Sequence, residues 1–214
     1  MQQSNYDRTR DEMRVKFLEY DQDGMIRRFS LHADENCLYL RMLGRTYRIG
    51  RTDGVVAWSD DGFDSCVPAD YLESLTIYDV LCCAKPGCRL SGQFAAAASL
   101  HGVVYTGHTN LSAPGCSGDT AAAAFDRQPE RLASACRMLG GTPEGRGDVA
   151  FRIPLFDFLP VLFQFWRADE EFPASITLLW DERVLDYLHY ESVCYAESLL
   201  LRRLRELVQA AERP

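Results

Sequence analysis

The spacing of hydrophobic and polar residues predicts helices at both ends of the chain. Met13, Phe17 and Tyr20 recur at intervals of three and four residues, which predicts an N-terminal helix over residues 4–21 ending in the polar sequence DQDG. The final segment, ESVCYAESLLLRRLRELVQAAERP, predicts a long helix with one apolar face. The residues of that face are Val193, Ala196, Leu200, Leu204, Leu207 and Ala211.

Two central segments also have helical patterns. VPADYLESLTIYDVLCCAKPG has a broad apolar face and a Pro-Gly stop. DTAAAAFDRQPERLASACRMLGG is predicted to be helical, with a break at Pro129 and an end at Gly140-Gly141.

Alternation with a period of two predicts strands in two blocks. CLYLRMLGRTYRIGRTDGVVAW is typical of a meander, with Gly44-Arg45 as a hairpin loop and Asp53-Gly54 as a second tight turn. GDVAFRIPLFDFLPVLFQFWRADEEFPASITLLWD predicts three strands joined by turns. The small, Gly-rich segment between the blocks, residues 90–119, predicts short strand structure and loops.

Blocks of antiparallel strands separated by helices predict the α+β class. We expect antiparallel sheet elements, an N-terminal meander and C-terminal hairpins, packed with N-terminal, central and long C-terminal helices. Residues 1–214 show no repeat and no low-complexity linker, so a single domain is expected. The best candidate for an internal hinge is the segment near 107–120.

Composition excludes some classes of function. The formal net charge is −8, which disfavours binding to nucleic acid or to an anionic membrane. No apolar run approaches the roughly 20 residues of a membrane helix. The polar N-terminus has no signal-peptide pattern, so a cytoplasmic location is expected.

The eight cysteines are expected to be reduced thiols in that compartment. None forms a Cys-x-x-Cys pair, and Cys82 and Cys83 end an apolar helical run, where free cysteine behaves as a small hydrophobic residue. No metal site is therefore predicted. His32 and His189 are single and have no neighbouring ligand in the sequence.

Three consecutive acids, Asp169, Glu170 and Glu171, are the most conspicuous candidate site. In a turn, their carboxylates could face one side and, with Asp148 or Asp181, bind a hard cation or act in acid–base chemistry. The simpler interpretation is a solvated hairpin turn.

In that interpretation, Phe172 fills the core beside the turn. Trp166 and Trp180 flank the acids as cross-strand partners would, and they could instead stack on a flat ligand. Core packing is the default for both.

Two other segments resemble known sites only partly. HGVVYTGHTNLSAPGCSGD contains His101, His108, Cys116, Ser117 and Asp119, but Asp119 stands where a Gly-x-Ser-x-Gly elbow needs glycine. EYDQDGMIRRFS resembles half of a calcium loop, yet its closing position is serine rather than glutamate, so a tight turn is expected there.

The C-terminal half contains a series of recognisable short motifs: Gly147-Asp148, Leu159-Pro160, Trp166, Asp169 to Pro173, Leu179-Trp180-Asp181 and Tyr187-Leu188. With LGRTYRI and LSGQF upstream, they resemble the uncharacterised family catalogued as domain of unknown function 3786, over roughly residues 43–204 and most specifically in the C-terminal half. AAAASLHG, Ala168 and Tyr190 depart from the family's pattern.

This resemblance implies a biological setting rather than a reaction. Members look typical of anaerobic bacteria and archaea, and some are joined to iron–sulfur segments, which implies an accessory role near metal or corrinoid metabolism. Three hypotheses follow: an accessory protein that binds a small ligand or a protein partner, a metal-dependent or acid–base hydrolase-like enzyme using the 169–171 acids with His101 or His108, and a structural interaction subunit.

Overall fold

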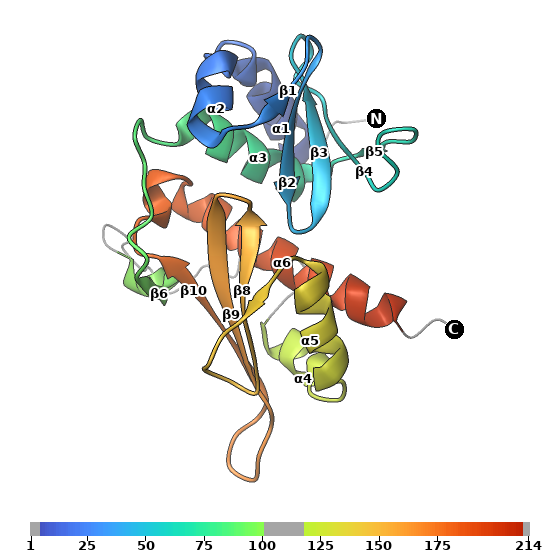
Figure 1. Ribbon diagram of the computed structural model, residues 1–214, viewed down its shortest axis with the longest axis vertical. Helices are drawn as coiled ribbons and strands as arrows, with labels where there is room; N and C mark the ends of the chain where they lie inside the picture. Colours follow the sequence, from blue (N-terminus) through green and yellow to red (C-terminus); the bar gives the residue numbers. More distant parts are fainter. Residues whose placement is uncertain (1–4, 101–117, 212–214) are drawn as a thin grey trace.

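The computed structural model describes residues 5–100 and 118–211 (Figure 1). In this part of the chain, ten strands form one antiparallel sheet with helices packed against it, so the predicted α+β class is confirmed. The helices are α1 (Asn5–Phe17), α2 (Gln22–Phe29), α3 (Tyr71–Cys83), α4 (Gly118–Phe125), α5 (Pro129–Met138) and α6 (Tyr190–Ala210), with 3-10 turns η1 (Ala97–Ser99) and η2 (Val184–Asp186). The strands are β1 (His32–Ala33), β2 (Cys37–Met42), β3 (Arg45–Gly50), β4 (Val56–Ser59), β5 (Val67–Pro68), β6 (Phe94–Ala96), β7 (Thr142–Pro143), β8 (Val149–Phe156), β9 (Leu159–Trp166) and β10 (Ser175–Asp181).

The sheet has two halves that meet at one point. Its order is β5-β4-β3-β2-β8-β9-β10-β6, with β1 added beside β2 and β7 beside β8. The predicted meander forms one half and the β8–β9–β10 hairpins form the other. Between β2 and β8 the ladder consists of the pair Met42 and Phe156, and the Leu43 N–H donates to the Leu155 carbonyl at 3.0 Å.

Each half has its own helical cover (Figure 1). In the N-terminal half, α1 packs on α3, and the Tyr78 hydroxyl on α3 donates to the Gly54 carbonyl beyond β3 at 2.6 Å. In the C-terminal half, α4 packs against β10 and α5 against β8. Strand β9 contributes one face to the hydrophobic core of this half. Val161, Phe163 and Phe165 on that face are fully buried, and the residues between them are more exposed.

Helix α6 connects the two halves because it packs on α3 in one and on α4 and α5 in the other. Its predicted apolar face is correct over most of its length. Val193, Ala196, Leu200 and Leu204 are fully buried, whereas Ala211 is exposed just beyond the end of the helix. The predicted break at Pro129 is also correct, with proline in the first turn of α5.

Two local predictions are wrong. DQDG was expected to end α1 in a turn, but Asp21 caps a second helix, α2, by accepting the Gly24 N–H at 2.9 Å. The first hairpin loop is Leu43-Gly44 rather than Gly44-Arg45, with φ of 49° and 77°. This is a type I′ turn, in which glycine takes the second place.

A buried group of charges ties β3, α3 and α6 together. Glu73, whose side chain is 5% exposed, accepts the Tyr47 hydroxyl at 3.0 Å and lies 3.6 Å from Arg45 and 3.4 Å from Arg202. Burial and Glu73 both raise the pKa of Tyr47, so this phenol stays protonated and donates. Glu73 also completes a capping box with Asp70 at the start of α3.

Replacing Glu73 with glutamine should destabilise the protein, because it removes the buried carboxylate that two arginines share, although both keep ion pairs with more exposed acids. We expect the free energy of unfolding to fall by about 1–3 kcal/mol, measured by urea denaturation followed by circular dichroism. Glu12→Gln is the control, since Glu12 pairs with Arg8 on an exposed helix face and should change stability by about 0.5 kcal/mol or less. Equal losses in both variants would contradict the role assigned to Glu73.

Candidate functional site

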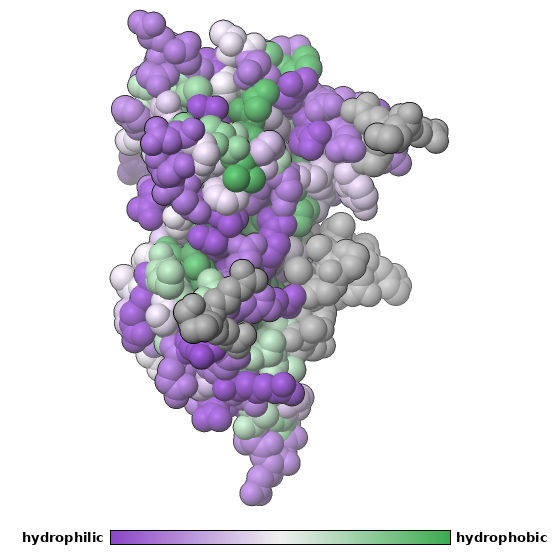
Figure 2. Space-filling model, turned by 90° about the vertical axis from the view of Figure 1, so that its right-hand side faces the viewer, coloured by the Kyte–Doolittle hydropathy of each residue, from purple (hydrophilic) through white to green (hydrophobic). Residues whose placement is uncertain are grey.

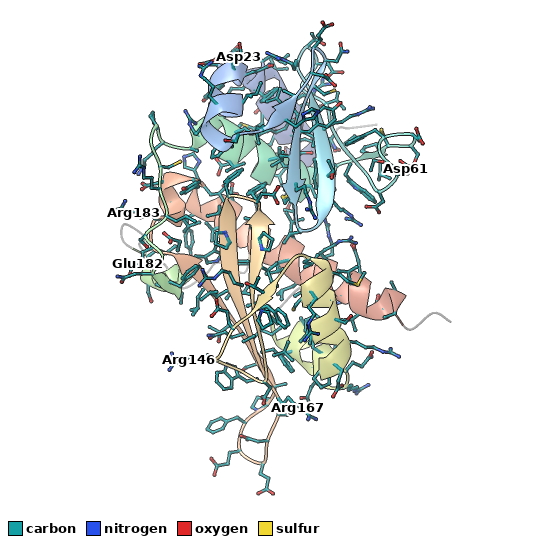
Figure 3. The ribbon with its side chains drawn as sticks, in the orientation of Figure 1. Asp23, Asp61, Arg146, Arg167, Glu182 and Arg183 are labelled. Carbon is teal, nitrogen blue, oxygen red and sulfur yellow. The ribbon has the colours of Figure 1, made fainter. Side chains whose placement is uncertain are left out.

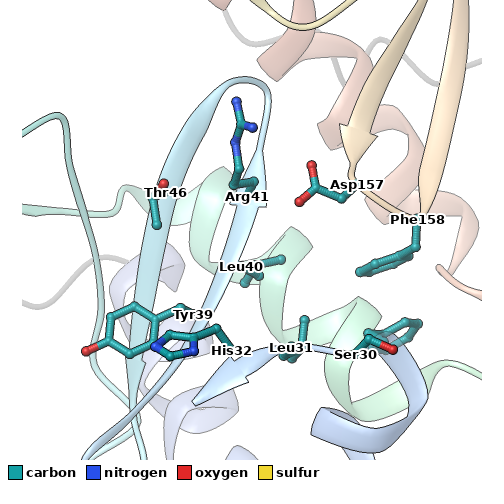
Figure 4. Close-up of a pocket in the computed structure, with 10 residues that line it drawn as sticks. Ser30, Leu31, His32, Tyr39, Leu40, Arg41, Thr46, Asp157 and Phe158 are labelled. Atoms are coloured by element: carbon teal, nitrogen blue, oxygen red, sulfur yellow. The ribbon is translucent and has the colours of Figure 1, made fainter. Parts of the chain in front are cut away.

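One pocket lies where the two halves of the sheet meet (Figure 4). Its volume is about 700 Å³, which is in the range typical of small-molecule sites. Three parts of the fold form it: the end of α2 with β1, the outer face of β2 and β3, and the turn between β8 and β9. The lining residues are Phe29, Ser30, Leu31, His32, Tyr39, Leu40, Arg41, Thr46, Asp157 and Phe158.

The register of the sheet explains how two charged residues reach this pocket. Met42 pairs with Phe156 in an antiparallel ladder, so the next positions outward, Arg41 and Asp157, come to face each other. Both side chains are exposed, and in residues 5–100 and 118–211 neither forms an ion pair. Arg41 and Asp157 also line a second pocket of about 260 Å³ on their other side. A cation and an anion thus line the same pockets.

Stacked aromatic rings form one wall of the pocket. The rings of Phe29 and Phe158 lie 4.1 Å apart at 16°, and Phe158 also stacks on Phe156 at 5.4 Å and on Tyr187 at 6.3 Å. Phe158 therefore has its position set by three neighbours, while its remaining surface faces the pocket (Figure 4). Such a wall suits a flat apolar molecule.

The opposite end of the pocket is polar. The rings of His32 and Tyr39 lie 5.3 Å apart, and the Tyr39 hydroxyl donates to Asp34 at 2.8 Å. That hydrogen bond, together with burial, raises the pKa of Tyr39 to about 12, so the phenol is neutral at physiological pH. The same hydrogen bond, reinforced by the N–H groups of Asn36 and Cys37, lowers the pKa of Asp34.

Ser30 places the end of α2 against this pocket. It is the C-cap of α2 and has φ of 52°, in the left-handed region where glycine is usual. Its N–H donates to the Ile26 carbonyl, and the chain then turns into β1. A non-glycine residue in this conformation is strained, and such residues are often found at binding sites.

The predicted acidic turn is an exposed loop whose first acid has a structural role. Asp169 accepts the N–H groups of Glu171 at 2.8 Å and Phe172 at 2.7 Å, and these bonds lower the pKa of Asp169. Glu170 and Glu171 are exposed. Phe172 is 66% exposed, so the expectation that it fills the core is wrong.

Two other acids hold the base of that loop. Asp148 accepts the Arg167 N–H at 2.7 Å, and Asp126, between α4 and α5, accepts the Ala168 N–H at 3.1 Å. Arg167 lies where β9 leaves the sheet, far from the N-terminal half (Figure 3). Asp148 and Asp169 are thus near the same end of the hairpin, and each is engaged by backbone donors.

Asp181 lies at the other end of β10 and is fully buried. Its carboxylate accepts the N–H groups of Ser91, Gly92 and Arg183, at 3.0, 2.7 and 2.9 Å, and the Ser91 hydroxyl. Burial acts to raise its pKa, but these donors outweigh burial and the pKa is lowered. Asp181 fastens the segment before β6 to the end of β10.

The two tryptophans were expected to face each other across the hairpin, but they do not. Trp166 pairs with Ser175, and Trp180 pairs with Val161. Trp180 is fully buried and donates to Glu197 at 2.9 Å, whereas Trp166 is 42% exposed beside the acidic loop. The spacing in the sequence already argues against the pairing, because Trp166 lies three residues before Asp169 and Trp180 lies nine residues after Glu171.

None of the six residues predicted as a binding site lines the pocket. Those residues are Asp148, Trp166, Asp169, Glu170, Glu171 and Asp181. The pocket residues carry no sequence signal, since they come from separate segments and form no motif. The hypothesis on His101, His108, Cys116 and Ser117 lies outside the described residues, as does most of the predicted hinge.

Comparison with known proteins adds the family. The model of the family described as domain of unknown function (DUF3786) matches residues 21–203, so the chain belongs to this family and the resemblance seen in the sequence is confirmed. No curated protein and no solved structure matches the chain.

The described helices include none long and apolar enough to cross a membrane. The face in Figure 2 is mostly hydrophilic, and its hydrophobic residues form small separate patches.

Replacing Asp181 with asparagine should have an effect that depends on pH. A lowered pKa in the folded state means that the ionised carboxylate stabilises the protein above its unfolded pKa of about 3.9, and that this stabilisation is lost as the pH falls through the folded pKa. We expect the variant to lose about 1–3 kcal/mol at pH 7 and much less at pH 2–3, measured by urea denaturation. The control is Asp60→Asn, an exposed acid after β4, and a loss for Asp181→Asn that is the same at both pH values would contradict this role.

Proposed function

We propose that this protein is a binding protein that holds a small planar ligand in the pocket between the two halves of the sheet. The observation that carries the proposal is a stacked aromatic wall combined with two charged side chains, Arg41 and Asp157, that line the same pocket and have no ion-pair partner in the described part of the chain. An aromatic wall with a few convergent polar groups is the usual composition of a small-molecule site.

The lining suggests the chemistry of the ligand. A flat ring system would pack on Phe158. An anionic group would bind the Arg41 guanidinium, and a donor group on the same molecule would reach the Asp157 carboxylate. The ligand we infer therefore combines a planar body with both an acidic and a hydrogen-bond-donating group.

Binding has more support than catalysis. Ser30 and His32 both line the pocket but are not hydrogen-bonded to each other, and the raised pKa of Tyr39 makes it a poor base. The alternative, a hydrolase-like enzyme using the 169–171 acids, has less support because Asp169 and Asp148 are engaged by backbone N–H groups at an exposed loop.

The biological setting is part of the proposal. All cysteines in the described residues are free thiols, which supports the expected cytoplasmic location. A ligand-binding protein would suit the accessory role in anaerobic metal or corrinoid metabolism that the family resemblance implied.

The proposal can be tested with 8-anilinonaphthalene-1-sulfonate, a fluorescent probe with aromatic rings and one anionic group. We expect one molecule to bind per chain, and both Arg41→Ala and Phe158→Ala to raise its dissociation constant about tenfold or more, equivalent to about 1.4 kcal/mol. Titration of probe fluorescence measures this effect.

The matched control is Arg146→Ala. Arg146 is also exposed, but it lies beside β7 and β8 in the lower half of the molecule, away from the pocket (Figure 3). Its removal should leave binding of the probe unchanged. If all three variants bind the probe like the unmodified protein, or if Arg146→Ala weakens it as much as Arg41→Ala, the pocket is not the binding site.

A further inference from the structure

Three side chains with metal-binding atoms meet between the end of α3 and the start of α6. They are Asp79 and Cys83, four residues apart on one face of α3, and His189, the residue before α6. A carboxylate oxygen, the thiol sulfur and an imidazole nitrogen all lie within 4.8 Å of one another. Among the residues that the structure describes, this is the one such group of three.

Asp79 is the buried centre of this group. Its side chain is only 10% exposed, and one oxygen lies 2.6 Å from Nδ1 of His189. The other oxygen accepts the His189 backbone N–H at 2.8 Å. Both the ring and the backbone of His189 are therefore held by one carboxylate, which keeps the imidazole close to α3.

The other two members leave the group open on one side. The His189 side chain is 71% exposed, and Cys83 is half-buried. The adjacent thiol of Cys82 is 9% exposed and belongs to the hydrophobic core. The helix thus buries one cysteine and presents the next one beside Asp79 and His189, at the surface.

The side chain of Lys85 is paired with another acid and does not compete for the Asp79 carboxylate. Lys85, two residues beyond Cys83, forms an ion pair with Asp186 at 2.7 Å, and its backbone N–H donates to the Asp186 carbonyl. These bonds also join the segment after α3 to the segment before α6. The segment that carries Cys83 and the segment that carries His189 are therefore joined next to the candidate ligands.

The donor set suits an ion of the zinc type. Such ions bind sulfur, nitrogen and oxygen together at about 2.0–2.3 Å, so ligand atoms around a tetrahedral centre lie roughly 3–4 Å apart. The observed group is within that reach after small side-chain rotations, in which His189 would move from its hydrogen bond with Asp79 to the ion. Hydrogen bonding of Asp79 to the start of α6 accounts for the carboxylate and the histidine. Cys83 packs partly against the core, and its thiol adds a third donor atom beside the other two.

The geometry points to a binding site for a divalent transition metal of the zinc type, held by Asp79, Cys83 and His189. The exposed side of the group would leave a fourth position for water or another small ligand, as in zinc sites with three protein ligands. Metal bound there would link α3 to α6. This site is separate from the pocket lined by Arg41 and Phe158, and neither proposal requires the other.

The experiment is a zinc titration of the metal-free full-length protein, in competition with a coloured chelator. We expect one equivalent of zinc to bind. Removing a residue that only hydrogen-bonds to a metal ligand typically weakens metal binding by roughly 10–100-fold. Cys83→Ser and His189→Gln each remove a proposed ligand and should weaken zinc binding by more than that. Cys82→Ala is the matched control because it removes the neighbouring thiol, and it should bind zinc normally. Circular dichroism checks that each variant is folded.

Cobalt(II) provides a second measurement on the unmodified protein, which does not depend on the folding of any variant. A cobalt ion bound by this group should show a thiolate-to-cobalt charge-transfer band and the intense visible absorption of a four-coordinate ion. Bound zinc should also protect Cys83 from alkylation, as measured by peptide mass spectrometry. The proposal is overturned if zinc does not bind stoichiometrically, if Cys83→Ser and His189→Gln bind it unchanged, or if the cobalt spectrum lacks the thiolate band.

Discussion

The contact between the β2–β3 hairpin and the end of β8 is the constraint on which the rest of the structure depends. One ladder pair, Met42 with Phe156, joins the two halves of the sheet there. Leu43 follows with φ of 49°, a conformation that is costly for a branched side chain. Its side chain is buried at the joint and its N–H donates to Leu155, and these interactions offset that cost. The same register places Arg41 opposite Asp157.

So short a ladder would not hold two half-sheets by itself, and helix α6 supplies the missing connection. Its 21 residues pack on α3 in one half and on α4 and α5 in the other. Arg202 on α6 and Arg45 on β3 share the buried carboxylate of Glu73. Because both arginines reach the same carboxylate, the group holds α6 in one arrangement against β3 and α3. The pocket and the Asp79–Cys83–His189 group both lie between elements that this arrangement brings together.

Hydrophobic periodicity predicted the long elements well and the short ones poorly. Helix α6 and strands β8 to β10 have patterns long enough to exclude the alternatives. Helix α2 was missed because its eight residues follow an aspartate that suits a turn as well as a helix cap. Among the candidate site residues, Asp148, Asp169 and Asp181 were noticed for their charge. In the structure, all three carboxylates accept backbone N–H groups. A single sequence does not distinguish a carboxylate with this structural role from a catalytic one.

The sequence by itself determined the α+β class, the family and most of the helices and strands, because these depend on local periodicity, capping and turn residues. Only the tertiary structure decided where chemistry could take place. Arg41 and Asp157 are 116 positions apart, Asp79 and His189 are 110, and no local pattern links either pair. Their proximity follows from a single strand register and from where α6 begins, and both are set by packing between distant segments rather than by any motif.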